Sequence, residues 1–199
     1  MEINESIKFA DLRKDFFSHA QKSSLYKTII ETNGKIVFGR GSDTPRVLFI
    51  GEAPGFSENA AGKPFVGRSG KLLDQWIKEL ALKENDFAII NVVPIIPLSN
   101  ENKIRPPTEE EINYFLPFTE KVISAINPEI IVLLGKSASS IFDKNIKLGQ
   151  LKEWKHMQIF FIYHPSYYLR NGGKGFEDTI QILKEILKQK RKQASLTNF

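Results

Sequence analysis

The sequence contains no cysteine, so disulfides, thiolate nucleophiles and cysteine-bound zinc or iron–sulfur clusters are excluded. It also contains no run that approaches the roughly 18 apolar residues of a membrane-spanning helix. Its opening residues, MEINESIKFADLRK, lack the apolar core of a signal peptide. We therefore expect a cytoplasmic protein with no membrane association.

The composition is that of an ordinary globular protein, with 199 residues of which 41% are hydrophobic and 26% charged. The 28 Lys and Arg against 23 Asp and Glu give a net charge of +5, which permits an anionic partner without requiring one. There is no internal repeat. We expect a single domain over 1–199, with an N-terminal helical segment (1–35) and a basic C-terminal helix and tail (176–199).

Apolar runs alternate along the chain with amphipathic stretches, and each run stops at Gly, Pro, Asn or His. This pattern is typical of buried strands in an α/β sheet. The four runs are RVLFIG (46–51), FAIINVVP (87–94), EIIVLLG (129–135) and QIFFIYHP (158–165). Strand followed by helix, repeated, predicts an α/β fold with a parallel sheet and helices on both of its faces.

The helices are predicted from apolar residues at helical spacing and from start signals. Thr108 and Glu111 form a capping box that opens one helix, and Pro117 is expected to interrupt or kink it. The predicted helices are 70–82, 108–126, 136–142 and 176–193, together with helical structure in the first 30 residues that packs Phe9, Leu12, Phe16 and Phe17.

Unusual residues follow the predicted strands, at the edge where parallel α/β sheets bind ligands. They are GEAPG (51–55), Asn91, Gly135 with Lys136 and Ser137, and HPSYYLR (164–170). The connection from 51 to 70 is also longer than the ~2 to 6 residues of a routine loop. Together these features predict a functional site at this edge.

Each residue also has an ordinary structural explanation. His164 can simply end a strand, Asn91 can turn the chain, and Phe65 can belong to the core. Glu52 and Glu58 can be exposed loop carboxylates, and the basic residues at 188–193 can be a solvated helix end. The joint arrangement of carboxylate, aromatic ring, amide and imidazole at one edge is what favours a site.

Five motifs in order, GEAPG, GKPFVGRSGKLLD, INVVP, RPPTEEEI and HPSYYLR, resemble the uracil-DNA glycosylase superfamily, nearest to its family 4. The resemblance covers about residues 37 to 170. It implies a three-layer α/β/α fold around a four-stranded parallel sheet. It also implies a monomeric DNA-repair enzyme, nucleoid-associated if bacterial. Such an enzyme flips uracil out of single- or double-stranded DNA and hydrolyses its N-glycosidic bond, leaving an abasic site.

The resemblance also implies roles for single residues around the base. Phe65 would stack on the flipped base, Asn91 would read its Watson–Crick edge, and His164 would donate a hydrogen bond to uracil O2. Gly51 and Ala53 would belong to the same pocket. The best-known branch of the superfamily has an aspartate where this chain has Ala53. The catalytic carboxylate is therefore left open between Glu52 and Glu58, with Glu52 slightly favoured.

Other motif residues would contact DNA if the resemblance holds. In HPSYYLR, aromatic and leucine side chains would insert or stack, and Arg170 would hold a phosphate. The full expected DNA-binding set is Arg68, Ser69, Lys136, Ser137, Ser166, Tyr167, Leu169 and Arg170, with Tyr168 as a further stacking candidate and Arg105 lining the groove.

Typical family 4 enzymes hold an iron–sulfur cluster on four cysteines, and this chain departs from that pattern. The corresponding positions are Ala20, Ser23, Ile95 and Phe115, none of which can ligate a cluster. We expect no metal and no cofactor, with apolar packing tying the N-terminal helix to the segment from 95 to 115.

Three other functions remain open at this point. A glycosylase of the same fold can act on hypoxanthine, xanthine or an oxidised pyrimidine, although Asn91 favours uracil. A non-catalytic protein that binds damaged DNA would not need Glu52, Phe65, Asn91 and His164 together. An unrelated nucleotide-binding protein is disfavoured because the chain has no GxGxxG or Walker pattern.

Overall fold

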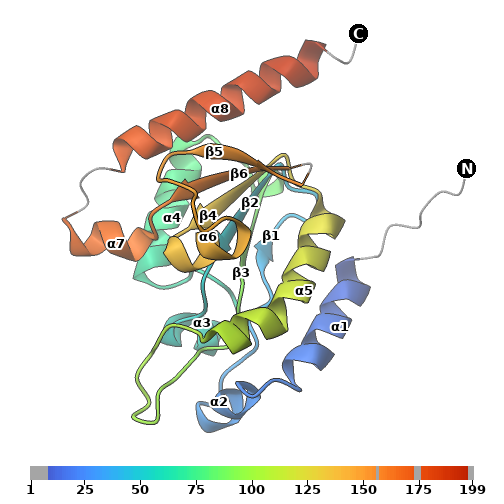
Figure 1. Cartoon of the computed structure of the whole chain (residues 1–199), viewed down its shortest axis with the longest axis vertical. Helices are drawn as coiled ribbons and strands as arrows, with labels where there is room; N and C mark the ends of the chain where they lie inside the picture. Colours follow the sequence, from blue (N-terminus) through green and yellow to red (C-terminus); the bar gives the residue numbers. More distant parts are fainter. Residues whose placement is uncertain (1–8, 156, 173–175, 197–199) are drawn as a thin grey trace, which may run out of the picture.

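The computed structural model describes residues 9–155, 157–172 and 176–196, and its centre is a six-stranded sheet (Figure 1). The strand order is β1-β3-β2-β4-β6-β5. The four inner strands run parallel and coincide with the four predicted runs: β2 (Val47–Gly51), β3 (Phe87–Asn91), β4 (Ile130–Leu134) and β6 (Met157–Ile162).

Two short antiparallel edge strands, which the sequence did not predict, complete the sheet. They are β1 (Arg40–Gly41), paired with β3, and β5 (Leu151–Trp154), paired with β6. A two-residue strand is too short to carry a periodic pattern. β5 has only partly buried or exposed side chains, so it lacks the apolar run by which the inner strands were found.

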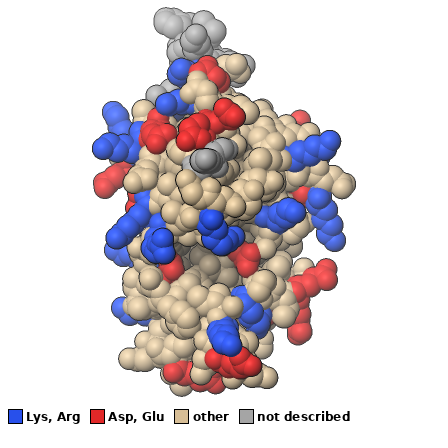
Figure 2. All heavy atoms as spheres, turned by 90° about the vertical axis from the view of Figure 1, so that its left-hand side faces the viewer, with Lys and Arg blue, Asp and Glu red and all other residues tan. Residues whose placement is uncertain are grey.

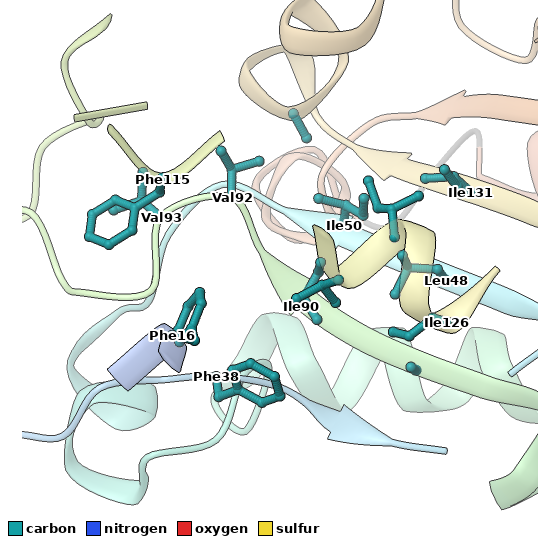
Figure 3. Close-up of a cluster of buried hydrophobic side chains, with 14 of the residues drawn as sticks. Phe16, Phe38, Leu48, Ile50, Ile90, Val92, Val93, Phe115, Ile126 and Ile131 are labelled. Carbon is teal, nitrogen blue, oxygen red and sulfur yellow. The ribbon is translucent and has the colours of Figure 1, made fainter. Parts of the chain in front are cut away.

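Every residue of β2, β3 and β4 is buried because both faces of the sheet are covered by helices. Leu48, Ile50 and Ile90 point to one face, where they meet Phe16 of α1 and Phe115 of α5 in one apolar cluster (Figure 3). The intervening residues point to a second cluster, which contains side chains of α4 and α8. The predicted three-layer α/β/α fold is therefore confirmed.

The helices cover the two apolar clusters, with α1 and α5 on one face of the sheet and α4 and α8 on the other (Figure 1). Their bounds are α1 (Phe9–Ala20), α2 (Tyr26–Glu31), α3 (Phe56–Ala61), α4 (Arg68–Glu79), α5 (Glu109–Ile126), α6 (Lys136–Phe142), α7 (Pro165–Arg170) and α8 (Glu177–Leu196), with a 3-10 turn at Glu84–Asp86.

The predicted start of α5 is confirmed at the level of single hydrogen bonds. The backbone N–H of Glu111 donates to Thr108 Oγ1 (3.2 Å), and the N–H of Thr108 donates to Glu111 Oε2 (2.7 Å). Pro117 lies inside α5 without ending it. Near the N-terminus, Leu12 and Phe16 are buried as expected, whereas the side chain of Phe9 lies outside the described residues.

Two segments for which the residue pattern predicted no helix contain one. The long connection after β2 includes α3, and HPSYYLR folds as α7 rather than as an open loop. His164 is the N-cap of α7 and Pro165 takes its first position, where a proline loses no intrahelical hydrogen bond. Because the segment is helical, its side chains point in different directions: Ser166 and Arg170 line the cavity at the sheet edge, whereas Tyr168 is buried.

The four positions where the resemblance expects cluster-ligating cysteines carry side chains that cannot ligate an iron–sulfur cluster. Three of them are buried in one apolar cluster (Ala20, Ile95 and Phe115), and the Ser23 hydroxyl donates to the Ala20 carbonyl at 2.8 Å. Beside them, the His19 ring stacks on Tyr114 at 4.2 Å, and the Tyr114 hydroxyl donates to the His19 carbonyl at 3.0 Å. Aromatic and aliphatic packing thus connects α1 to α5.

The described part of the chain has no group of three or more His, Asp or Glu side chains placed to hold a metal ion. Among the helices of that same part, none is long and apolar enough to cross a membrane.

Candidate active site

A cavity of about 820 Å³ opens at the carboxyl ends of the parallel strands. Glu52 follows β2, Asn91 ends β3, Leu134 ends β4 and His164 follows β6, and all four line the cavity. The predicted site residues that line it are Glu52, Ala53, Glu58, Phe65, Arg68, Ser69, Asn91, Lys136, His164, Ser166 and Arg170. The topology therefore brings together side chains from 52 to 170 in the sequence.

Phe65 forms an aromatic wall of this cavity in an uncommon backbone conformation. Its φ is +54°, and its ring centroid lies 5.5 Å from that of His164. A Cβ on Gly51 would come within 2.6 Å of the Phe65 ring and 2.5 Å of Asn91 Oδ1, and a Cβ on Gly70 would overlap the Phe65 carbonyl. These two glycines therefore permit the close packing that places Phe65. Gly51 was expected to line the pocket, but it is not among the residues that line it and packs against Phe65 and Asn91 instead.

Asn91 presents a buried amide to the cavity. Its residue is only 5% exposed, and its Oδ1 has no hydrogen-bond partner among the residues that the structure describes. A buried polar atom without a partner is costly, by roughly 1 to 3 kcal/mol. We infer that a bound molecule supplies the missing donor.

The hydrogen bonds of His164 fix which ring nitrogen carries the proton. The backbone N–H of Ser166 donates to Nδ1 (3.2 Å), and the Ser166 hydroxyl lies 2.8 Å from the same atom. Arg170 donates to that hydroxyl oxygen (3.2 Å), which leaves the hydroxyl hydrogen free to donate to Nδ1. Nδ1 is therefore the acceptor, and the proton of the neutral ring is on Nε2.

The environment of His164 also keeps its ring neutral. Burial is the main cause that lowers its pKa, from 6.5 to about 4, and the positive charge of Arg170 acts in the same direction. The carboxylate of Glu58 opposes them without reversing the shift. At neutral pH the ring is thus an uncharged hydrogen-bond donor through Nε2.

The two candidate carboxylates differ in what they contact. Glu58 Oε1 accepts from the backbone N–H of Val66 (2.9 Å) and of Gly67 (2.8 Å), and Oε2 accepts from Gly55 (3.1 Å). No hydrogen bond to the Glu52 carboxylate is present within the described ranges. Glu58 therefore holds the loop that carries Phe65, whereas Glu52 is available to a water molecule in the cavity.

We expect Glu58→Gln to destabilise the protein by about 2 kcal/mol, because an amide replaces one carboxylate oxygen that accepts a backbone N–H with an N–H₂ group that cannot. Equilibrium unfolding in urea measures this change. The rate of substrate turnover should fall as well, because the loop bearing Phe65 loosens.

Glu52→Gln is the matched control for this measurement. It makes the same chemical change on a carboxylate that holds no backbone group in the described chain, so the free energy of unfolding should stay within about 0.5 kcal/mol of the wild type. Unchanged stability in Glu58→Gln, with a loss of turnover equal to that of Glu52→Gln, would instead place Glu58 on the substrate.

Figure 2 shows a hollow near the middle of the face drawn there, and positive side chains surround it. Arg68, Lys136 and Arg170 line the cavity, are exposed, and form no ion pair within the described residues. Arg105 also lines it, but its guanidinium is paired with Glu111 through two hydrogen bonds (2.8 and 2.5 Å). The first three are therefore free to meet phosphates.

The α7 helix corrects part of the expected DNA-binding set. Tyr168 is only 2% exposed and packs edge-on against Trp76 at 5.3 Å, so the expectation that it stacks on DNA is wrong. Tyr167 and Leu169 are exposed but do not line the cavity, and Ser137 does not line it either. DNA contacts by these three remain predictions. Sequence reasoning missed Phe56 and Ile104, which do line the cavity.

An uncharged imidazole donor, a buried amide and an aromatic wall at one sheet edge define a site for a flat heterocycle with hydrogen-bonding groups on its edge. Residues 38–188 match the model of the uracil DNA glycosylase superfamily, and the chain belongs to that family.

Several proteins named Type-4 uracil-DNA glycosylase are similar to this chain. The one from Saccharolobus solfataricus is 36% identical over 95% of this chain and 90% of its own length. The one from Thermotoga maritima is 37% identical over 68% and 72%, and the one from Sulfurisphaera tokodaii is 38% identical over 74% and 73%.

Proposed function

We propose that this protein is a uracil-DNA glycosylase that removes uracil from DNA and leaves an abasic site. The observation that carries the proposal is the unpartnered Oδ1 of Asn91, a buried residue that lines the same cavity as His164 and Phe65. Uracil offers the O4 acceptor and N3–H donor that a single amide can satisfy together, whereas cytosine reverses both.

The charges suit the bond that must break. As the bond between N1 and the sugar C1′ lengthens, its electron pair moves onto uracil and negative charge grows on O2, where the Nε2–H of His164 can donate. Water then bonds to C1′, and the proton that it loses neutralises the departing uracil anion. We assign the positioning of this water to Glu52, because its carboxylate holds no other group in the described chain.

The DNA strand would reach the cavity across its basic rim. Arg68, Lys136 and Arg170 suit phosphates on either side of the flipped nucleotide, in single- or double-stranded DNA. We also propose that the protein acts as a monomer and as one domain, since one chain supplies a carboxylate, an amide, an imidazole and an aromatic ring to the same cavity. A DNA substrate also supports a cytoplasmic location, associated with the nucleoid if the source is bacterial.

We further propose that no metal or iron–sulfur cluster takes part. The positions of the four family cysteines are occupied by Ala20, Ser23, Ile95 and Phe115, which support α1 and α5 by packing instead.

The deciding experiment uses a labelled oligonucleotide with one uracil, incubated with the protein in EDTA and then treated with alkali. Alkali-dependent cleavage at uracil is the expected result. Parallel oligonucleotides carry hypoxanthine, xanthine or a thymine mismatch. Cleavage at one of those bases alone would replace the substrate, and tight binding without any cleavage would indicate a damage-binding protein.

A further inference from the structure

Two large apolar side chains that line the cavity are also exposed to solvent. Phe56, the first residue of α3, is 50% exposed, and Ile104 is 51% exposed. They belong to neighbouring segments, because Ile104 Cδ1 lies 3.9 Å from the position that a Cβ on Gly55, the residue before Phe56, would take. Both also line the cavity, so this apolar lip (Phe56 and Ile104) is continuous with the proposed uracil site.

The segment that carries Ile104 is held by backbone pairing and by the hydrogen bonds of its neighbour Arg105. Ile104 pairs with Leu98 across a short hairpin that runs beside α3 in Figure 1. The Arg105 guanidinium donates to the Leu98 carbonyl (3.2 Å) and pairs with Glu111 at the start of α5. Burial opposes ionisation of Glu111, but the hydrogen bonds from Arg105 and Thr108 outweigh it and lower its pKa. This anchored hairpin presents Ile104 to solvent.

The rest of the rim has a different character. Arg68, Lys136 and Arg170 offer positive charge, which suits the phosphates of a strand. The lip offers only apolar surface, which suits the flat face of a base. A strand that delivers one nucleotide into the cavity must place its neighbours at the mouth, and in single-stranded DNA their faces are free to stack.

We propose that the lip of Phe56 and Ile104 stacks on the base next to the flipped uracil in single-stranded DNA. This inference rests on the proposed function and assigns the lip a partner within the same substrate. Stacking on an aromatic side chain does not depend on base identity, because every base has a π face. The lip therefore favours unpaired DNA without adding sequence preference.

The test compares wild type with Phe56→Ser and Ile104→Ser on two single-stranded oligonucleotides. Each holds one uracil; in one, normal bases flank it, and in the other, abasic tetrahydrofuran residues replace both neighbours. Binding is measured by fluorescence anisotropy with a non-cleavable 2′-fluoro uridine. We expect Phe56→Ser to bind the normal strand about tenfold more weakly than wild type, and Ile104→Ser a fewfold more weakly. On the abasic-flanked strand all three proteins should bind alike.

Ile30→Ser is the matched control, because Ile30 is 71% exposed on α2 and does not line the cavity. It should bind both strands as wild type does, and thermal unfolding should show all variants folded. Wild-type affinity in Phe56→Ser, or an equal loss on both strands, would overturn the proposal. Either result, with uracil still excised by wild type, leaves the proposed function standing; absence of excision by wild type would overturn the function itself.

Discussion

Replacing His164 with alanine should lower the rate of uracil release about 100-fold or more. In the proposed mechanism the Nε2–H of His164 donates to the charge that grows on uracil O2, and the loss of one such donor typically costs about two to three orders of magnitude in kcat. Affinity for DNA should change less than about threefold, because the proposed phosphate contacts are made by other side chains, those of Arg68, Lys136 and Arg170. Single-turnover excision measures the rate, and anisotropy with non-cleavable DNA measures the affinity.

The pH dependence tests whether the donor is the neutral ring. With a pKa near 4, His164 is uncharged from about pH 5 upward, so protonation of its ring contributes no rise in the rate as the pH falls through 6.5. Stability should fall over the same interval, from 6.5 toward 4, because the unfolded chain binds a proton there that the folded chain does not. If the wild-type rate rises as the pH falls through 6.5, and the rate of His164→Ala does not, the donor is an imidazolium instead.

His19→Ala provides a control at another histidine. His19 stacks on Tyr114 and connects α1 to α5, and it does not line the cavity. Its replacement should lower the melting temperature and leave the rate of uracil release unchanged.

A loss of DNA affinity in His164→Ala with an unchanged rate of uracil release would make His164 a binding residue only.

Asn91→Asp should reduce uracil excision about 100-fold and allow slow release of cytosine. The change keeps the shape of the side chain but replaces its N–H₂ donor, so uracil O4 would face a carboxylate oxygen in a buried site. A protonated carboxyl can instead donate to cytosine N3 and accept from its amino group. Single-turnover assays on matched uracil and cytosine oligonucleotides measure both effects.

Cytosine release by Asn91→Asp should increase as the pH falls, because the buried carboxyl must carry a proton to pair with cytosine. The substitution leaves the proposed phosphate-binding residues unchanged, so the affinity of this variant for uracil-free DNA should equal that of the wild type. Uracil excision at the wild-type rate would remove Asn91 from the base-reading role.

The inner sheet and most of the cavity residues could be predicted from the residue pattern. Buried parallel strands leave continuous apolar runs, and β2, β3, β4 and β6 all have them. Because parallel strands end at one edge, the residues after them could be assigned to one site, and Glu52, Asn91 and His164 do line one cavity. The helix α5 was predicted from the side-chain chemistry of its first turn.

Other features depended on contacts between segments that are distant in the sequence. The sequence alone could not separate Glu52 from Glu58, since the difference lies in the backbone groups of Val66 and Gly67 that fold back onto Glu58. Nor could it show that Tyr168 is buried while its neighbours are exposed, which follows from the short helix α7 lying on α4.

The sequence by itself determined the fold class, the edge of the sheet that carries the site, and the residue types present there. These follow from local periodicity and from the rule that parallel strands share their direction. Only the tertiary structure decided the proton position on His164, the loop-holding contacts of Glu58 and the apolar lip of Phe56 and Ile104. Each of these depends on distances and directions of a few ångströms between chain segments, which no residue pattern encodes.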